Sequence, residues 1–410
     1  MAERLVRGRP ARDDAYPQPA TGREKVAQID PGTPTWLRAH NDRTALRLLL
    51  ERGPLTRAQL GELSGMSKPT ATQMISRLES AGLVSAVGTV SGGRGPNAVS
   101  YGVRADRLLG VAVSMQATVI QAVVVDALDA EHPVVELPTA ASGRTPEQDI
   151  RTAVAVACEA AQVGTRAVRL VAVGVQAAVD SAADTLSLTD TLPGWPAAGA
   201  RTRIEQALGL DVTVENDVNL AAMAERAVGA GQQADSFVLF WLGEGLGLGV
   251  DLGGVVHRGS FGSAGEIGYL PLPAAAAALD PDATDATELL GGPAIVRLAG
   301  LTVPGTAAEL AARFGADPAL LTAVADRVAV VLASALAVLD PALVVLGGPT
   351  SAAGGPALAE LVADRVAGGP RPGLVVQPSR TGPRPVLLGA RQLLVDQIRE
   401  RLVSDITAGG

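Results

Sequence analysis

The sequence predicts two joined parts: an N-terminal winged helix-turn-helix and a larger α/β body with two lobes. The first hundred residues show three short helical patterns followed by two strands around a glycine-rich turn. From about Leu108, Val-rich strands alternate with Ala-rich helices, which is typical of an α/β fold. The length of 410 residues exceeds the usual size of one hydrophobic core. These observations predict at least two packing units.

The chain opens with a segment that has no hydrophobic periodicity. Residues 1–37 are rich in Pro, Arg, Asp and Gly, so we expect a mobile tail outside the fold. The DNA-binding domain is predicted over residues 38–104. From about Asn41 the pattern becomes helical, because Leu46, Leu49 and Leu50 repeat at intervals of three and four and Gly53 ends the segment. A helix of about three turns is predicted.

Two further helices are marked by their capping residues. Thr56 stands at a helix start, and Gln59, three residues on, completes a capping box. After a tight turn over 64–66, Ser67 caps a third helix whose first turn contains Pro69, where the missing N–H costs nothing. This third helix is predicted to run to about Ala81. The strands over 83–87 and 98–101, joined by the turn over 91–96, form the predicted wing.

The third helix is the candidate recognition helix. In a helix-turn-helix, the exposed side chains of this helix enter the major groove, so they should be polar and able to form hydrogen bonds. The residues that meet this requirement are Ser67, Lys68, Thr70, Thr72, Gln73 and Arg77. Arg94, at the tip of the wing, is expected to reach the minor groove or the DNA backbone. A three-helix module with a hairpin that serves dimerisation alone is the alternative.

The charge distribution favours the DNA-binding interpretation. Residues 1–104 carry 15 Lys and Arg against 9 Asp and Glu, whereas residues 105–410 carry 19 against 33. A basic head on an acidic body indicates one segment that meets a polyanion and another that meets a different partner. A basic tail alone accounts for part of this excess, but not for Lys68, Arg77 and Arg94.

The body is predicted to span residues 105–410. Lobe one takes residues 105–215 with a C-terminal helix over 390–405, and lobe two takes residues 216–389. The predicted strands lie at 111–113, 119–125, 170–175, 212–214, 237–242 and 343–346. The lone cysteine, Cys158, lies in a helical pattern and is expected to be a buried thiol. The longest apolar run, 328–339, is too short for a bilayer, and no secretory signal is recognised, so we expect a cytoplasmic protein without membrane contact.

Three stretches of the body carry functional information. A strand delivers Asn216 and Asp217 before a helix, the place where open α/β sheets bind ligands. A glycine-spaced run over 243–249 leads to a second glycine-rich run over 258–268, which contains Ala264, Gly265 and Glu266. A buried strand over 343–346 ends on a Gly pair. Taken singly, Asn216 or Asp217 fits a helix cap equally well, and Glu266 fits an ordinary surface carboxylate.

Together these stretches resemble the ROK family over roughly residues 38–400. Its members are sugar kinases and sugar-responsive repressors of the xylose and N-acetylglucosamine type, built on the actin-like ATPase (ribonuclease H-like) fold. The family's repressors carry a winged helix with a Gly-Gly-Arg wing ahead of the body. The resemblance implies that Asn216, Asp217 and the Gly265-Glu266 motif bind sugar hydroxyls. Carboxylates and amides suit polyols because they accept hydroxyl protons.

The sequence departs from the family's kinases at both phosphate loops. The family's first loop reads Asp-x-Gly-x-Thr, whereas residues 111–118 here contain neither a carboxylate nor a glycine. Mg²⁺ therefore lacks an organising ligand there, and the backbone cannot approach a triphosphate closely. In the second loop Glu244 replaces a threonine, and its charge repels phosphate. We therefore expect no catalytic residue, no cofactor and no enzymatic activity.

The family's structural zinc site is also expected to be absent. It needs a histidine and three cysteines, but Tyr269 stands at the histidine's place and no cysteine follows it. Tyr269 and Glu288 are carried over as further ligand-binding candidates, Glu288 because the family places a sugar-binding glutamate near that position. No metal is expected.

The sequence thus predicts a transcriptional regulator, most simply a repressor, that binds operator DNA and responds to a monosaccharide or a derivative. A homodimer or a dimer of dimers is expected, because two operator half-sites one helical turn apart need two DNA-binding domains. An active sugar kinase with an appended DNA-binding domain is one alternative. A constitutive DNA-binding dimer without a ligand is the other.

Overall fold

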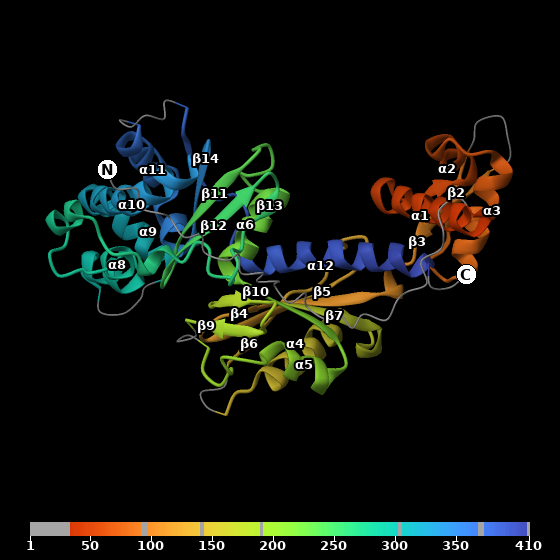
Figure 1. Cartoon of the computed structure of the whole chain (residues 1–410), viewed down its shortest axis with the longest axis horizontal. Helices are drawn as coiled ribbons and strands as arrows, with labels where there is room; N and C mark the ends of the chain where they lie inside the picture. Colours follow the sequence, from red (N-terminus) through yellow and green to blue (C-terminus); the bar gives the residue numbers. More distant parts are fainter. Residues whose placement is uncertain are drawn as a thin grey trace, which may run out of the picture.

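The computed structural model describes residues 33–91, 97–139, 143–188, 192–301, 306–367 and 373–407. A winged helix lies at one end of the molecule, and one long helix, α12 (Pro385–Ser404), runs from it to the junction of two α/β lobes (Figure 1). The fold class predicted from the sequence is confirmed.

The first helix is longer than predicted. α1 spans Pro34–Arg52, and the Oγ1 of Thr33 caps it by accepting a hydrogen bond from the N–H of Trp36 at 3.1 Å. The prediction of a helical start near residue 41, and of a tail that reaches residue 37, was wrong. The reason is that the first turns of α1 carry no buried stripe: Trp36 stacks on His40 near the surface, and the buried positions begin at Asn41. Apolar periodicity detects only the packed part of a helix.

The predicted caps of the next two helices are confirmed. In α2 (Arg57–Ser64) Thr56 and Gln59 form the reciprocal capping box. In α3 (Lys68–Ser80) the Oγ of Ser67 accepts a hydrogen bond from the N–H of Thr70. The wing consists of β1 (Leu55–Thr56), β3 (Ala98–Val103) and β2 (Val84–Val90), in that order. Arg94 lies outside the described residues.

Lobe one is built on a five-stranded sheet of order β10-β7-β4-β5-β6. Its strands are β4 (Leu109–Met115), β5 (Val119–Val125), β6 (Val135–Pro138), β7 (Val168–Val175) and β10 (Asp211–Asn216). A separate hairpin is formed by β8 (Ala178–Asp180) and β9 (Thr185–Ser187). Helices α4 (Pro146–Ala160) and α5 (Ala200–Leu208) cover one face of the sheet, where Cys158 is buried. α12 covers the other face.

Lobe two repeats this topology, in the order β13-β12-β11-β14-β15. Its strands are β11 (Phe237–Leu242), β12 (Leu246–Leu252), β13 (Val255–Val256), β14 (Leu343–Gly347) and β15 (Val375–Pro378). Its helices are α7 (Ala286–Leu290), α8 (Gly292–Leu298), α9 (Ala307–Ala316), α10 (Pro318–Leu339) and α11 (Gly348–Val366), the last bent at Gly355. In both lobes three antiparallel strands are followed by two parallel ones.

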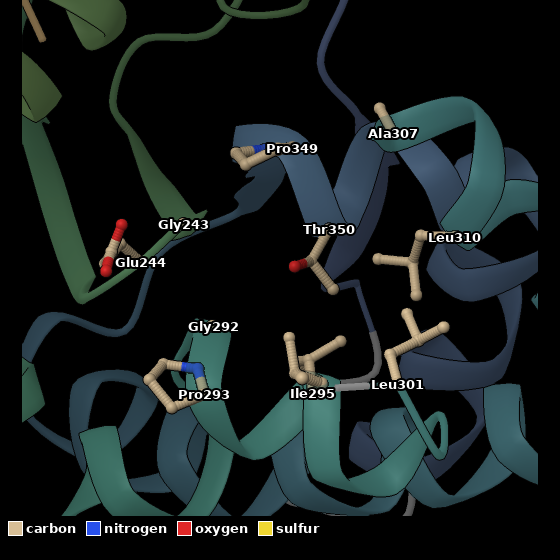
Figure 2. A pocket seen from close by; sticks show the side chains of 11 residues that line it. Gly243, Glu244, Gly292, Pro293, Ile295, Leu301, Ala307, Leu310, Pro349 and Thr350 are labelled. Carbon is tan, nitrogen blue, oxygen red and sulfur yellow. The ribbon is translucent and has the colours of Figure 1, made fainter. Parts of the chain in front are cut away.

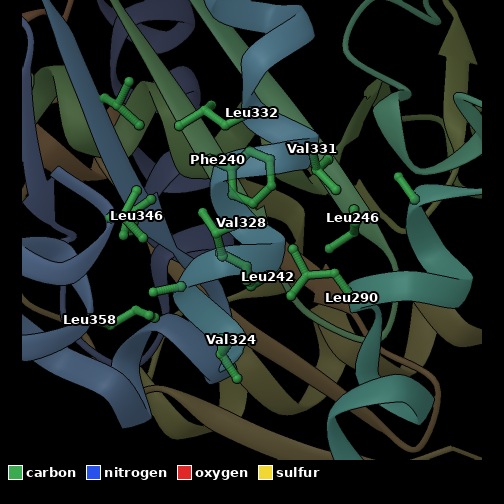
Figure 3. Packing of buried hydrophobic residues seen from close by; sticks show 14 of the residues in the cluster. Phe240, Leu242, Leu246, Leu290, Val324, Val328, Val331, Leu332, Leu346 and Leu358 are labelled. Atoms are coloured by element: carbon green, nitrogen blue, oxygen red, sulfur yellow. The ribbon is translucent and has the colours of Figure 1, made fainter. Parts of the chain in front are cut away.

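Helix α10 forms the centre of the core of lobe two. Val324, Val328 and Leu332 are fully buried and pack into the cluster that contains Phe240 and Leu246 of the sheet (Figure 3). Among the described helices α10 is the one whose length and composition would allow it to cross a membrane, and half of its most apolar stretch is buried inside the protein. We interpret α10 as a core helix, because its apolar residues pack into the core of lobe two.

Helix α12 connects the body to the winged helix. It begins five residues earlier than predicted and packs on β4, β5 and β7 of lobe one. At its far end Leu402 and Val403 join the hydrophobic cluster that contains Leu46 and Leu49 of α1. The winged helix and lobe one therefore share one continuous core.

Candidate functional site

Asp217 lies where the sequence predicted it, at the carboxyl end of a parallel strand. β10 ends at Asn216, and Asp217 opens α6 (Asp217–Val228). β4, β7 and β10 run parallel, so their carboxyl ends lie at the same edge of the sheet of lobe one. This edge is the usual ligand-binding side of an open α/β sheet.

Asn216 serves as the N-cap of α6. Its Oδ1 accepts a hydrogen bond from the N–H of Asn219 at 3.0 Å, and its Nδ2 donates to the carbonyl of Ala177 at 3.0 Å. The helix-cap alternative is thus realised, and both polar ends of the side chain already have protein partners. The contribution of Asn216 to the site is to fix the start of α6.

Glu215 holds the same turn in place, and the sequence analysis overlooked it. It is 5% exposed and accepts hydrogen bonds from the N–H of Asn216 and from the Nδ2 of Asn219, each at 3.0 Å. Its other oxygen accepts from Nε of Arg258, in the loop that leads to Glu266. This ion pair joins lobe one to a loop of lobe two. A carboxylate directly after Val214, at the carboxyl end of a strand, was the signal that could have revealed it.

Glycines bring α6 and the Glu266 loop together. A Cβ on Gly249 of β12 would lie 2.7 Å from the Cβ of Ala222, and one on Gly247 would lie 2.7 Å from a methyl of Val218. The glycine-spaced strand therefore allows α6 to pack closely. Gly265 has φ +87°, and a Cβ there would lie 1.9 Å from the carbonyl oxygen of Leu248. Only glycine fits at this position beside Glu266.

Both carboxyl groups have raised pKa values. The pKa of Asp217 is raised to about 7, mainly by burial and also by the nearby Glu266, while the hydrogen bond from the N–H of Val218 opposes the shift. Partial burial also raises the pKa of Glu266. Neighbouring acids with raised pKa values are typical of functional sites. Such a pair can both donate to and accept from sugar hydroxyls near neutral pH.

The other two predicted ligand residues, Tyr269 and Glu288, are both exposed to solvent. Tyr269 is 56% exposed at the end of a short 3₁₀ turn (Ile267–Tyr269). Glu288 is exposed, and its carboxylate accepts hydrogen bonds from the N–H and the hydroxyl of Thr284, each at 2.7 Å. It closes the first turn of α7. Trp195 is a core residue of lobe one, where its Nε1 donates to Asp149 at 3.1 Å.

The place of the first phosphate loop is a tight hairpin between β4 and β5. The N–H of Gln116 donates to the carbonyl of Val119 at 3.0 Å, which closes the turn. Met115 is fully buried, and an N–H of Arg144 approaches its sulfur at 3.2 Å. Packed side chains of this hairpin therefore occupy the place where the family's kinases hold a phosphate.

Glu244 lies at the turn between β11 and β12, beside a cavity of about 180 Å³ (Figure 2). The carbonyl of Glu244 accepts a hydrogen bond from the N–H of Gly292 at 2.9 Å, which fixes the turn against α8. Its carboxylate is the charged group among the described residues that line the cavity.

In the winged helix, α3 exposes most of the predicted DNA-reading residues. Ser67, Lys68, Thr72 and Gln73 are exposed, while Thr70 is half-buried. Ser76 is exposed as well, four residues after Thr72, and the sequence analysis missed it although its spacing places it on the same helix face. Met74, Ile75 and Leu78 are buried, as predicted.

Arg77 is bound within the protein. Its Nε and one terminal nitrogen donate to both carboxylate oxygens of Asp42 in α1, at 2.7 and 2.6 Å. These hydrogen bonds raise the pKa of Arg77. The guanidinium therefore fastens α3 to α1, and a role in reading DNA rests on its remaining N–H groups.

Models of known protein families match both parts of the chain. A model of the ROK family matches residues 110–397. The chain belongs to the ROK family. A model of the MarR family matches residues 41–86, which cover α2, α3 and most of α1. The predicted family membership and the helix-turn-helix ahead of the ROK domain are confirmed.

Relatives of this ROK protein include both regulators and kinases. It is 23% identical to the xylose repressor of Bacillus subtilis over 273 residues, covering 60% of this chain and 63% of the repressor. It is 38% identical to the glucokinase of Streptomyces coelicolor over 128 residues, covering 31% of this chain and 39% of the enzyme. The chain therefore spans less than two thirds of each of these relatives.

The solved structures that this chain resembles also include both a regulator and a kinase. A ROK family transcriptional regulator, a homologue of the Escherichia coli MLC protein, matches with TM-score 0.66 and 17% identity, covering 91% of this chain and all of that one. A ROK family glucokinase from Streptomyces griseus, in complex with glucose and AMPPNP, matches with TM-score 0.55 and 28% identity, covering 70% of this chain and 98% of that one. The match to the regulator extends over both the winged helix and the body, and it shows the fold.

Proposed function

We propose that this ROK protein is a cytoplasmic, homodimeric transcriptional repressor whose operator binding is controlled by a monosaccharide or a derivative. The observation that carries the proposal is the union, on one chain, of an exposed polar recognition helix with the Asp217–Glu266 pair. Gly265 and Glu266 come from lobe two and Asp217 from the end of the lobe-one sheet, so a ligand between them bridges the lobes.

The packing of α6 against α12 connects the proposed ligand site to the winged helix. α6 begins at Asp217 and crosses α12 at backbone contact, because a Cβ on Gly389 would lie 1.8 Å from the carbonyl oxygen of Leu220. α12 in turn shares a core with α1. A change in the angle between the lobes at Asp217 therefore moves the base of the winged helix. In a dimer this motion changes the spacing of the two recognition helices.

A sugar kinase is the second candidate, and the pKa of Asp217 favours it. A carboxylate with a pKa of about 7 is well matched to general-base work at neutral pH. The absence of a carboxylate from residues 111–118, and the charge of Glu244, speak against phosphoryl transfer. An assay with radiolabelled ATP and Mg²⁺ decides between the candidates. A kinase transfers the label to glucose, N-acetylglucosamine or xylose, whereas the regulator does not.

The decisive experiment measures DNA binding with and without sugars. The purified chain selects its site from random-sequence DNA, and fluorescence anisotropy then follows binding across a panel of monosaccharides. We expect at least one sugar to weaken binding at least ~10-fold, a coupling typical of allosteric repressors. Glu266→Gln should abolish the sugar response and leave DNA affinity unchanged. Glu400→Gln, an exposed carboxylate on α12, serves as the control.

The outcomes separate the hypotheses. Selection of no preferred DNA site contradicts the regulator. DNA binding that no sugar alters, together with an inert Glu266→Gln substitution, indicates a constitutive DNA-binding dimer. The recognition helix is tested in the same assay, because Lys68→Ala should reduce the slope of log affinity against log salt by about 1, as expected for loss of one phosphate contact.

A further inference from the structure

Lobe two contains a small cavity that the proposed function does not use. It measures about 180 Å³ and lies between α8, α9, the start of α11 and the turn that carries Glu244 (Figure 2). Asp217, Gly265 and Glu266 are not among the residues that line it. The side chains that form most of its wall are Pro293, Ile295, Leu301, Leu310, Pro349 and Thr350.

The size of the cavity limits its occupant to one ring. An apolar cavity of ~150 Å³ holds a single benzene molecule, so this partly open one encloses a single ring and lets a short polar chain extend to its rim. The aliphatic walls favour a ring that buries carbon against Ile295 and Leu310, because removing that surface from water is the main source of affinity for such a ligand.

The polar groups of the cavity determine which charge the occupant can carry. Glu244 supplies a negative charge at the rim, and the described residues of the lining include no Lys, Arg or His. Among the same described residues the hydroxyl of Thr350 is the other side-chain polar group, and Figure 2 shows its oxygen on the side of the Gly243–Glu244 turn. An anion placed there meets a like charge without a counter-ion, whereas an amine meets a carboxylate and a hydroxyl acceptor.

We propose that this cavity binds a second small ligand, a single-ring apolar molecule that is neutral or carries an amine. Glu244, an exposed carboxylate at the rim, disfavours anions, phosphate esters included. The site is separate from the proposed sugar site, so the protein receives two chemically different signals. Glu244, which is incompatible with a phosphate, is then the residue that selects the occupant.

Binding is measured on the full-length chain by saturation-transfer NMR and equilibrium dialysis with three matched probes: phenethylamine, 2-phenylethanol and phenylacetate. Ligands of nine or ten heavy atoms in a partly open apolar site are expected to bind with Kd on the order of 0.1–1 mM. The amine should bind about fivefold more tightly than the alcohol, the gain expected from one solvent-screened ion pair. Phenylacetate should bind more weakly than the alcohol by a similar factor, because it meets the same screened charge.

Two pairs of variants make the test specific. Ala307→Phe places a ring in the cavity from an exposed helix position and should abolish probe binding, whereas Ala308→Phe, also exposed but outside the lining, should not. Glu244→Gln should remove the preference for the amine over the alcohol and the penalty on phenylacetate. Glu360→Gln, an exposed carboxylate on α11 that is absent from the lining, should leave both unchanged.

The result that overturns the proposal is absence of probe binding at concentrations about tenfold above the expected Kd, or binding that Ala307→Phe leaves intact. Either result leaves the sugar-controlled regulator untouched, because that function is measured with sugars and Glu266→Gln. Conversely, loss of every sugar response with intact binding of phenethylamine would remove the proposed function and keep this second site.

Discussion

At the scale of single residues, three consecutive polar side chains at the end of β10 have three different roles. Glu215 is buried and ties the turn to Arg258, and Asn216 caps α6. Asp217 accepts a hydrogen bond from the N–H of its neighbour Val218 and has a raised pKa. Its hydrogen bonds among the described residues are to local backbone, so the carboxylate can still accept from a ligand, which is expected to contact it.

The raised pKa of Asp217 makes a prediction about stability. A buried acid whose folded pKa is about 7 holds a proton that the unfolded chain releases near its ordinary pKa of ~3.9. Stability therefore falls as pH rises from about 4 to 7, and the full penalty remains above pH 7. Asp217→Asn should raise the free energy of unfolding at pH 8 by about 2 to 4 kcal/mol and change little at pH 4, as measured by urea denaturation.

The same substitution should weaken sugar binding at least ~10-fold, because the amide cannot accept as a carboxylate does. A gain in stability together with a loss of affinity distinguishes a ligand contact from a structural residue. Asp235→Asn, at an exposed carboxylate, should alter neither quantity. An equal stability change at pH 4 and pH 8 would contradict the raised pKa.

Arg77 makes the second prediction at this scale. Arg77→Ala leaves Asp42, whose side chain is 9% exposed, without its cation, so the winged helix should lose about 2 to 3 kcal/mol of stability. The double substitution with Asp42→Asn should recover part of this loss. Thermal melts of the four proteins in the cycle measure the coupling. If Arg77→Ala changed base preference in DNA selection without changing the melting temperature, its main role would be in reading DNA.

At the scale of elements, the glycines of β12 determine how α6 meets the sheet of lobe two. In the sequence they resembled a phosphate loop, but the structure places Gly247 and Gly249 under α6. Gly245, in the same glycine-spaced run, has open space around it. Of the four glycines in this run, Gly247 and Gly249 are required by the packing of α6, Gly243 lies against Trp241, and Gly245 is not constrained by a neighbour.

This difference yields a paired test. In Gly249→Ala the new methyl would lie 2.7 Å from the Cβ of Ala222 and 3.1 Å from the carbonyl of Val218, so α6 must shift. We expect a loss of about 1 to 3 kcal/mol of stability and weaker sugar binding. Gly245→Ala should cost less than ~0.5 kcal/mol. Equal effects of the two substitutions, measured by calorimetry and sugar titration, would contradict the packing role.

At the scale of the whole molecule, α12 makes the winged helix and lobe one a single cooperative unit. Leu402 at the end of α12 is buried in the cluster that contains Leu46 and Leu49. Leu402→Ala should cost about 2 to 4 kcal/mol and should let the winged helix melt before the body. Differential scanning calorimetry should then resolve two transitions that overlap in the parent protein. Glu400→Ala, exposed on the same turn, should leave the profile unchanged.

The sequence by itself determined the features that depend on local chemistry. Thr56 with Gln59, and Ser67 before Pro69, predicted helix starts because a cap is satisfied within three residues. The buried strands β5 and β11 were predicted at their observed bounds, since continuous runs of apolar residues mark them. The order of the motifs predicted the family and hence the fold.

Only the tertiary structure decided which neighbours each side chain meets. The repeated sheet topology of the two lobes leaves no trace in the sequence, because burial constrains hydrophobicity and not identity. The pairing of Arg77 with Asp42, of Glu215 with Arg258, and of Gly249 with α6 joins residues far apart in the chain. Such contacts depend on how the elements pack. Local sequence records what a residue can do, and the fold determines with which partner it does so.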